Sequence, residues 1–188
     1  MDFDKLKRAT NHLHKCFELF CIWELGVVNS RYAKLFYDSN VLGAIGCNVY
    51  ETLNIKLNIF FEMNGKHSLS ILIQLLPIGK IRTQIATRLR KIKTVNSQTI
   101  KDIEWLRNKY FAHYDDIEQN DWIDKFSKHK ELLELLNDIQ DLFILIWYNS
   151  KGEVPYKFDN VAFTNSIVKI FNPLLPETEE KGIRYFTL

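Results

Sequence analysis

Apolar residues recur every three to four positions over long stretches of this 188-residue chain, and no other feature limits its fold as strongly. Near the start, Leu6, Leu13, Phe17, Phe20 and Trp23 keep this spacing. The spacing places apolar side chains on one face of a helix, whereas a half-buried strand requires a period of two. The seven glycines and four prolines fall mainly where such stretches should end. The sequence therefore predicts an all-α fold.

Breaks in this pattern divide the chain into segments that we expect to be helical. These segments cover residues 3–28, 32–36, 41–62, 68–76, 78–92, 98–113, 128–147 and 160–171. Short connections between long helices favour an antiparallel bundle with additional short helices. Ser97 is the expected N-cap of the helix over residues 98–113. The length predicts a single domain over residues 1–175, followed by a polar tail over residues 176–188.

The charges are distributed unevenly, although the net charge is only +2. Residues 63–101 contain no Asp or Glu but eight Lys and Arg residues. In residues 115–141, nine acidic residues outnumber three lysines. Either these two segments attract each other within the domain, or the basic one binds a polyanion. Charge alone favours the first interpretation.

Several classes of site are not expected, because the residues that they require are missing. The chain has no glycine-rich phosphate loop, no nucleophile elbow and no Glu-x-x-His pair. His12 and His14 point ~200° apart on a helix, so we expect no metal site, and we expect no cofactor. Cys16, Cys21 and Cys47 form no CxxC motif and indicate reduced thiols in a cytoplasmic protein. We expect neither a signal peptide nor a membrane-spanning segment.

Residues 105–115, WLRNKYFAHYD, place an arginine within an apolar stripe. If each residue advances ~100° around a helix, the apolar and aromatic side chains lie within an arc of ~140°, the width of a core-facing stripe. They are Ile100, Ile103, Leu106, Tyr110, Phe111 and Tyr114. Arg107 lies within the same arc. A guanidinium in that position must be paired, must extend to solvent or must face something other than the core.

Arg107, Asn108 and His113 together provide the groups needed to break a phosphodiester without a metal ion. A guanidinium holds a phosphate bidentately, an imidazole transfers protons near neutral pH, and an amide can orient either group. Arg107 and His113 lie ~9 Å apart along an ideal α-helix, with an angular offset of ~120°. A frayed helix end or a groove completed by a second subunit would let them converge. The alternative, which residue types alone favour, is that Arg107 pairs with Glu104 and His113 caps the helix.

The order of residues in this segment resembles a known motif. Arg-Asn, then an apolar and aromatic run, then His near a helix end resembles the HEPN motif Arg-x(4–6)-His, and Arg107-x5-His113 fits it. Further segments resemble the AbiU-type abortive-infection branch of HEPN proteins. They are Trp23-Glu24-Leu25, Tyr32 to Phe36, Val49-Tyr50-Glu51-Thr52-Leu53 and His67-Ser68-Leu69. The resemblance covers about residues 10 to 150.

The resemblance implies a HEPN-like bundle with the activity of a metal-independent endoribonuclease. In such enzymes the ribose 2′-OH attacks the adjacent phosphate, in a cleft between two protomers, and leaves a 2′,3′-cyclic phosphate and a 5′-OH. By this resemblance, Arg107 would stabilise the charged phosphate, His113 would act as general acid or base, and Asn108 would position them. The resemblance also implies a homodimer and a toxin-type role in phage defence, with a possible cognate antitoxin.

The basic segment before the motif would guide RNA to the site, an inference from charge. The residues expected to bind RNA are Lys80, Arg82, Arg88, Arg90, Lys91, Lys93 and Lys109. One alternative is a catalytically inactive HEPN-like module that binds RNA or a partner protein. Another is a structural helical adaptor, in which the basic segment meets the acidic one within the domain.

Overall fold

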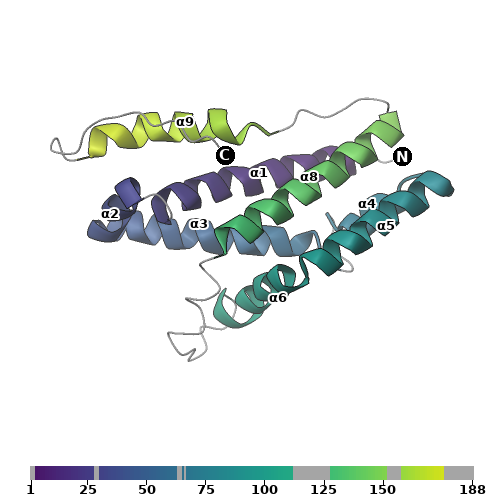
Figure 1. Cartoon of the computed structure of the whole chain (residues 1–188), viewed down its shortest axis with the longest axis horizontal. Helices are drawn as coiled ribbons and strands as arrows, with labels where there is room; N and C mark the ends of the chain where they lie inside the picture. Colours follow the sequence, from purple (N-terminus) through teal and green to yellow (C-terminus); the bar gives the residue numbers. More distant parts are fainter. Residues whose placement is uncertain are drawn as a thin grey trace. The chain divides into compact units, whose positions relative to one another are not determined.

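The computed structural model describes residues 3–27, 30–62, 65, 67–111, 128–151 and 158–175. In order, the elements are α1 (Phe3–Val27), α2 (Ser30–Asp38), α3 (Asn40–Ile59), α4 (Leu69–Gln74), α5 (Lys80–Val95), α6 (Ser97–Trp105), the π-helix η1 (Leu106–Phe111), α8 (His129–Lys151), α9 (Asn160–Phe171) and the 3-10 helix η2 (Asn172–Leu174) (Figure 1). No strand occurs among these residues. The all-α prediction is confirmed.

The chain divides into two compact units. The first comprises Met1–Cys16 and Asn54–Lys157, and the second comprises Phe17–Leu53 and Phe158–Leu188. The single domain predicted over residues 1–175 stays a prediction, and the predicted tail lies outside the described residues. None of the described helices is long and apolar enough to cross a membrane.

In the first unit, α5 packs against α4, α6 and α8. Its buried residues are Ile85, Leu89 and Ile92, which the helical period places on one face. The core residues of α8 keep the same period: Leu132, Leu135, Leu136, Ile139, Leu142, Phe143 and Ile146. The apolar spacing in the sequence therefore places these side chains on the faces through which α5 and α8 pack.

The second unit contains a smaller core that joins residues from α1, α2 and α9. The Tyr32 hydroxyl donates a hydrogen bond to Asn172 Oδ1 at 2.6 Å. A Cβ atom added at Gly26 would lie 2.8 Å from the Phe36 ring, so this glycine is needed for the close packing of the ring. Burial raises the pKa of the Cys21 thiol to about 11, which keeps it protonated near neutral pH.

Most predicted helix boundaries agree with the structure within a few residues. The segment over 160–171 matches α9, and Asp159 caps it by accepting a hydrogen bond from the Ala162 amide at 2.9 Å. Ser97 is the first residue of α6 rather than its N-cap, so that prediction is wrong by one residue. The N-cap position is Asn96, whose side chain donates to Ile92 O and Asp138 Oδ2 and therefore does not cap α6.

The end of α3 also differs from the prediction, and the difference matters for the site. The segment was expected to be helical to residue 62, but the α-helix ends at Ile59. The Phe61 and Glu62 amides both donate to Asn58 O, at 2.9 and 3.2 Å. The Phe61 bond spans three residues, and bonds of this length tighten the last turn of a helix. They fix the backbone that carries Phe61 and Glu62.

Candidate functional site

The segment that carries Arg107 is not a continuous α-helix. The α-helical part ends at Trp105, and Leu106–Phe111 form a π-helix. This corrects the ideal α-helix expected over residues 98–113. Helices of the π type are rare in proteins as a whole, but those that occur often lie at functional sites. The predicted offset between Arg107 and His113 assumed an α-helix and no longer holds, and His113 lies outside the described residues.

The Arg107 side chain is 45% exposed and is therefore not sealed in the core. Its Nη2 atom lies 3.1 Å from Glu62 Oε1, and its Nη1 atom donates a hydrogen bond to Asn108 Oδ1 at 3.2 Å. The alternative considered from the sequence named Glu104 as the carboxylate partner, but the ion pair links Arg107 to Glu62 in the turn after α3. The two contacts fix the direction of the guanidinium on both sides.

Glu62 is itself held by a buried residue. The Asn58 side chain, in a residue only 6% exposed, donates a hydrogen bond to Glu62 Oε1 at 3.0 Å. The same oxygen therefore receives the amide of Asn58 and the guanidinium of Arg107. An exposed ion pair contributes only about 0–1 kcal/mol to stability. The main effect of this chain of contacts is to orient Arg107.

Arg107 lies at the edge of a cleft of about 490 Å³. The lining residues are Asn58, Phe61, Glu62, Lys93, Ser97, Ile100, Lys101, Glu104 and Arg107. Five of these residues follow one another at intervals of one or three positions along α6 and η1. A single face of that helical segment therefore forms one wall. The end of α3 contributes Asn58, the turn after it contributes Phe61 and Glu62, and the last turn of α5 contributes Lys93.

Among the described residues that line this cleft, positive side chains outnumber negative ones. Lys93, Lys101 and Arg107 give three positive charges, and Glu62 and Glu104 give two negative ones, which leaves a charge of +1. Lys101 and Glu104 are exposed residues of α6. An open site with an excess of cations favours an anionic ligand.

The predicted RNA-binding residues of α5 are spread over its exposed sides. With the buried face of α5 as reference, Arg82 and Lys93 lie on one flank of the helix, and Lys80, Arg90 and Lys91 lie roughly opposite the core. Only Lys93 lines the cleft. The contacts of the others with RNA stay a prediction. The backbone of Lys109 lies in η1, and its side chain is outside the described part.

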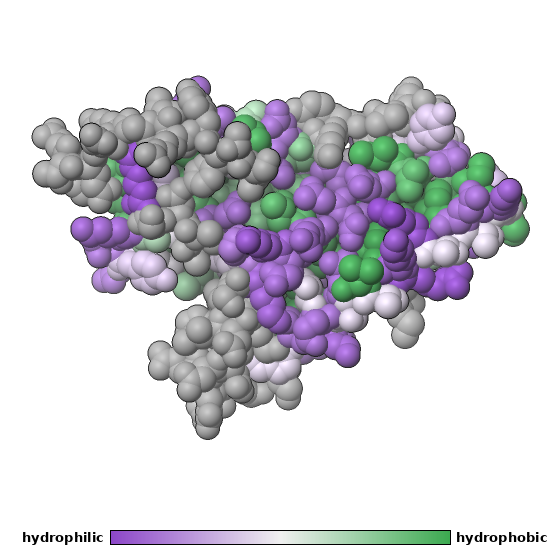
Figure 2. Space-filling view, in the orientation of Figure 1, coloured by the Kyte–Doolittle hydropathy of each residue, from purple (hydrophilic) through white to green (hydrophobic). Residues whose placement is uncertain are grey.

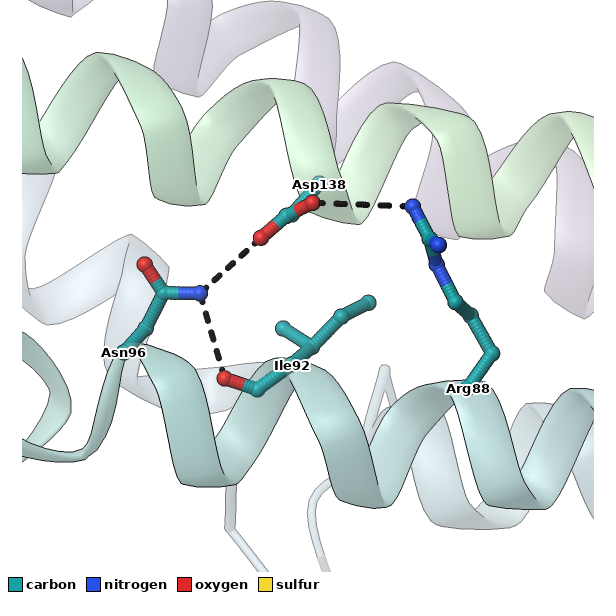
Figure 3. A network of polar contacts seen from close by, with 4 residues as sticks. All are labelled: Arg88, Ile92, Asn96 and Asp138. Atoms are coloured by element: carbon teal, nitrogen blue, oxygen red, sulfur yellow. Dashed lines mark hydrogen bonds and ion pairs between the residues drawn. The ribbon is translucent and has the colours of Figure 1, made fainter.

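Arg88 faces α8 instead of the cleft. Its Nη2 atom lies 3.8 Å from Asp138 Oδ1, and Asn96 Nδ2 donates to Asp138 Oδ2 at 2.9 Å (Figure 3). At this point the basic segment meets the acidic one, as the adaptor interpretation expects. Figure 2 shows hydrophilic residues over much of the surface that α5 and α8 present, with small hydrophobic patches between them.

The contacts and burial of the histidines and cysteines near the start of the chain indicate structural roles for them. His12 Nε2 donates a hydrogen bond to Lys56 O at 3.0 Å, and its ring stacks on His67 with centroids 5.1 Å apart. Desolvation lowers the pKa of His12 and favours the neutral imidazole. Burial raises the pKa of Cys16 to about 12. Among the described residues, no three His, Cys, Asp or Glu side chains lie together as a metal site requires.

Sequence reasoning identified Arg107, Asn108 and Lys93 but missed the other wall of the cleft. Glu62 and Asn58 were not singled out, although they lie four positions apart within the segment predicted to be helical to residue 62, a spacing typical of an interacting helical pair. The chemistry of the assembled site is that of an oriented guanidinium beside two lysines, which can hold and polarise a phosphate. Comparison with protein-family models, with curated proteins and with solved structures found no match.

Proposed function

We propose that this chain is a metal-independent endoribonuclease of the HEPN toxin or abortive-infection type, which cleaves RNA by transesterification. The observation that carries the proposal is the state of Arg107. Its guanidinium is exposed in a cleft with excess positive charge, and Asn108 and Glu62 fix its direction. An arginine that served only the core would be buried and paired there.

The proposed reaction needs no group beyond the side chains of the chain. The ribose 2′-oxygen attacks the phosphorus, the bond from phosphorus to the 5′-oxygen breaks, and a 2′,3′-cyclic phosphate forms. His113 takes the proton from the 2′-hydroxyl while solvent water protonates the leaving 5′-oxygen, or it protonates the 5′-oxygen while water takes the proton of the 2′-hydroxyl. Arg107 has five N–H donors, and among the described residues Glu62 and Asn108 engage two of them, so the others can face the charge that develops on the phosphate.

The proposal includes a homodimer, because a second copy would complete the groove around Arg107 and His113. The exposed side chains of Val41 and Ile45, four positions apart on α3, support an additional apolar contact of this helix. The resemblance to HEPN proteins further suggests a cytoplasmic toxin restrained by a cognate antitoxin. RNA is the proposed substrate.

The test is an RNA cleavage assay in the presence of EDTA, with wild type beside Arg107→Ala and His113→Ala. Arg8→Ala and His129→Ala are the matched controls, because each removes the same side-chain type from a position outside the cleft. We expect cleavage by wild type and both controls only, with cyclic phosphate ends on the products. Equal cleavage by Arg107→Ala and wild type would refute the proposed role of the guanidinium.

A second candidate is an inactive HEPN-like module that binds RNA. The observation in its favour is that Glu62 already offsets the charge of Arg107. This candidate predicts intact RNA in every lane of the same assay, together with RNA binding that persists in His113→Ala. The adaptor interpretation gains support from the contact between Arg88 and Asp138, and predicts little salt-sensitive affinity for RNA.

A further inference from the structure

We infer that the cleft is a subsite for one nucleotide of single-stranded RNA, which binds the phosphate through Lys93, Lys101 and Arg107 and the base against Phe61. The inference rests on the proposed function for the nature of the ligand, and it adds which surface of the chain binds it. It assigns RNA contacts to Lys101 and Phe61, and it separates Lys93 from the other cations of α5.

The phosphate site follows from the positions of the cations. Lys93 comes from the last turn of α5, Lys101 from the exposed face of α6, and Arg107 from η1, and all three line one cleft. The guanidinium is already oriented, whereas the two lysines are flexible point charges that adapt to the phosphate. Cations that converge in a cleft bind a phosphate better than cations spread around a helix, because each adds to the same local field.

The base site follows from the two apolar residues of the lining. Phe61 belongs to the tight turn after α3, where its amide donates to Asn58 O at 2.9 Å. It is only partly buried, and Ile100 from α6 lines the same cleft. Unpaired bases bind proteins by stacking on such aromatic side chains. A volume of about 490 Å³ lies within the usual range for a site that binds a small ligand.

Glu104 provides a test in which the expected change in RNA affinity is an increase instead of a decrease. Its carboxylate lines the same cleft and lowers the excess positive charge there. Replacement of Glu104 by Gln keeps the shape and raises the charge of the cleft from +1 to +2. If the cleft binds phosphate, this variant must bind RNA more tightly than wild type.

The experiment measures the binding of a labelled single-stranded 2′-O-methyl RNA by fluorescence anisotropy at several salt concentrations. This probe lacks the attacking 2′-hydroxyl, so binding is observed whether or not the protein cleaves RNA. We expect Lys101→Ala and Lys93→Ala to bind severalfold more weakly, each with a slope of log K against log[salt] that is smaller by about 0.7. The matched control is Lys7→Ala, an exposed residue of α1 outside the cleft that is not among the predicted RNA-binding residues, and it should bind within about twofold of wild type.

Two further variants complete the set. Loss of base stacking in Phe61→Ala should weaken binding about fivefold or more, whereas Glu104→Gln should strengthen it. Because Phe61 is partly buried, thermal unfolding is measured for this variant, and the conclusion is drawn from the lysine variants if it is unfolded.

The outcomes separate this inference from the proposed function. If wild type cleaves RNA but the Lys93, Lys101 and Glu104 variants bind as wild type does, the inference is overturned and the function stands. If no RNA is cleaved but these variants change affinity in the expected directions and Lys7→Ala does not, the subsite stands and the nuclease proposal fails. Absence of any salt-sensitive binding by wild type would overturn the inference.

Discussion

The segment formed by α6 and η1 has two faces with different roles: one packs against the core and the other lines the cleft. Residues of the two faces can be direct neighbours in the sequence. Leu106 is 1% exposed, whereas the next residue, Arg107, has an exposed side chain in the cleft. Ile103 is buried on the packed side, and Lys101 is exposed on the cleft side. Burial of apolar area stabilises the first face. The second face leaves its charges open to solvent and to a ligand.

The charged residues of the two faces also have different environments. Asp102 is 5% exposed and accepts hydrogen bonds from Lys128 Nζ at 2.7 Å and from Gln98 Nε2 at 3.0 Å. Its charge is therefore matched within the protein. Arg107 is paired with Glu62 at the surface, where an ion pair is weak and a phosphate can compete with it. Buried charges must be matched permanently, and only the exposed ones can be used for recognition.

The largest expected effect separates these faces at adjacent residues. Leu106→Ala should lower the free energy of unfolding by about 2–5 kcal/mol, because it removes a fully buried side chain and leaves a cavity. Urea unfolding of purified protein would measure the change. The activity of the folded fraction should remain, and full stability in this variant would show that the packed face does not depend on Leu106.

Arg107→Ala should have the converse effect. We expect a loss of about 10²–10³ in the cleavage rate, the usual effect of removing one group that stabilises a developing oxyanion. The free energy of unfolding should change by no more than about 0.5 kcal/mol, as for most surface substitutions. The two measurements are single-turnover cleavage and urea unfolding on the same preparation. A fall in stability with unchanged cleavage would reverse the assignment of the two faces.

Asp102→Ala tests the matched charge of the packed face. It removes an acceptor from Lys128 and Gln98, and hydrogen bonds to charged groups contribute about 1.5–3 kcal/mol each. Because Lys128 is a third exposed, we expect a total loss of only about 1–3 kcal/mol in unfolding free energy. RNA affinity should stay unchanged. A change in affinity comparable to that of Lys101→Ala would mean that the faces are coupled.

Arg88→Ala should have a small effect, although Arg88 is one of the predicted RNA-binding residues. Its pair with Asp138 is long and 42% exposed on the arginine side, so we expect a loss of about 0.2–1 kcal/mol in unfolding free energy. If α5 binds RNA mainly through the cleft, RNA affinity should fall less than in Lys93→Ala. A larger fall than in Lys93→Ala would place the binding surface on the side of α5 that faces α8.

We expect the smallest effect from a change of pH. It acts through His12, whose ring is hydrogen-bonded to Lys56 O near the end of α3. Burial lowers the pKa of His12 below 6.5, so the unfolded chain binds more protons than the folded one between the two pKa values. His12 therefore makes stability rise with pH in this window: its contribution is complete above about pH 6.5 and is lost as the pH falls toward the folded pKa. Unfolding curves between pH 7.5 and 5.5 would show the slope.

The matched variant for the pH experiment is His12→Gln. Its side-chain amide can still donate to Lys56 O but does not titrate near neutral pH. The dependence of stability on pH should become flatter in this variant. An identical slope in wild type and His12→Gln would mean that another group, such as the neighbouring His67, is responsible.

Much of the fold could be predicted from the sequence because helices depend on local periodicity. The apolar spacing predicted α1 and α9 to within a residue, and Arg107 was singled out because its charge disagreed with the stripe around it. The limits of α3 and α6 were less accurate. Their ends depend on hydrogen bonds such as those of Asn58 and Asn96, which are made in the assembled structure.

The sequence by itself determined the helical class, the order of the helices and the residue types of the motif, since these follow from neighbours within a few positions. The tertiary structure decided which wall faces Arg107, because Glu62 and Asn58 reach it only after α3 and η1 have come together. It also decided that Lys93 joins the cleft while Arg88 turns to Asp138. A list of cations in a sequence gives their number, but only the packing of the helices decides which of them act on the same ligand.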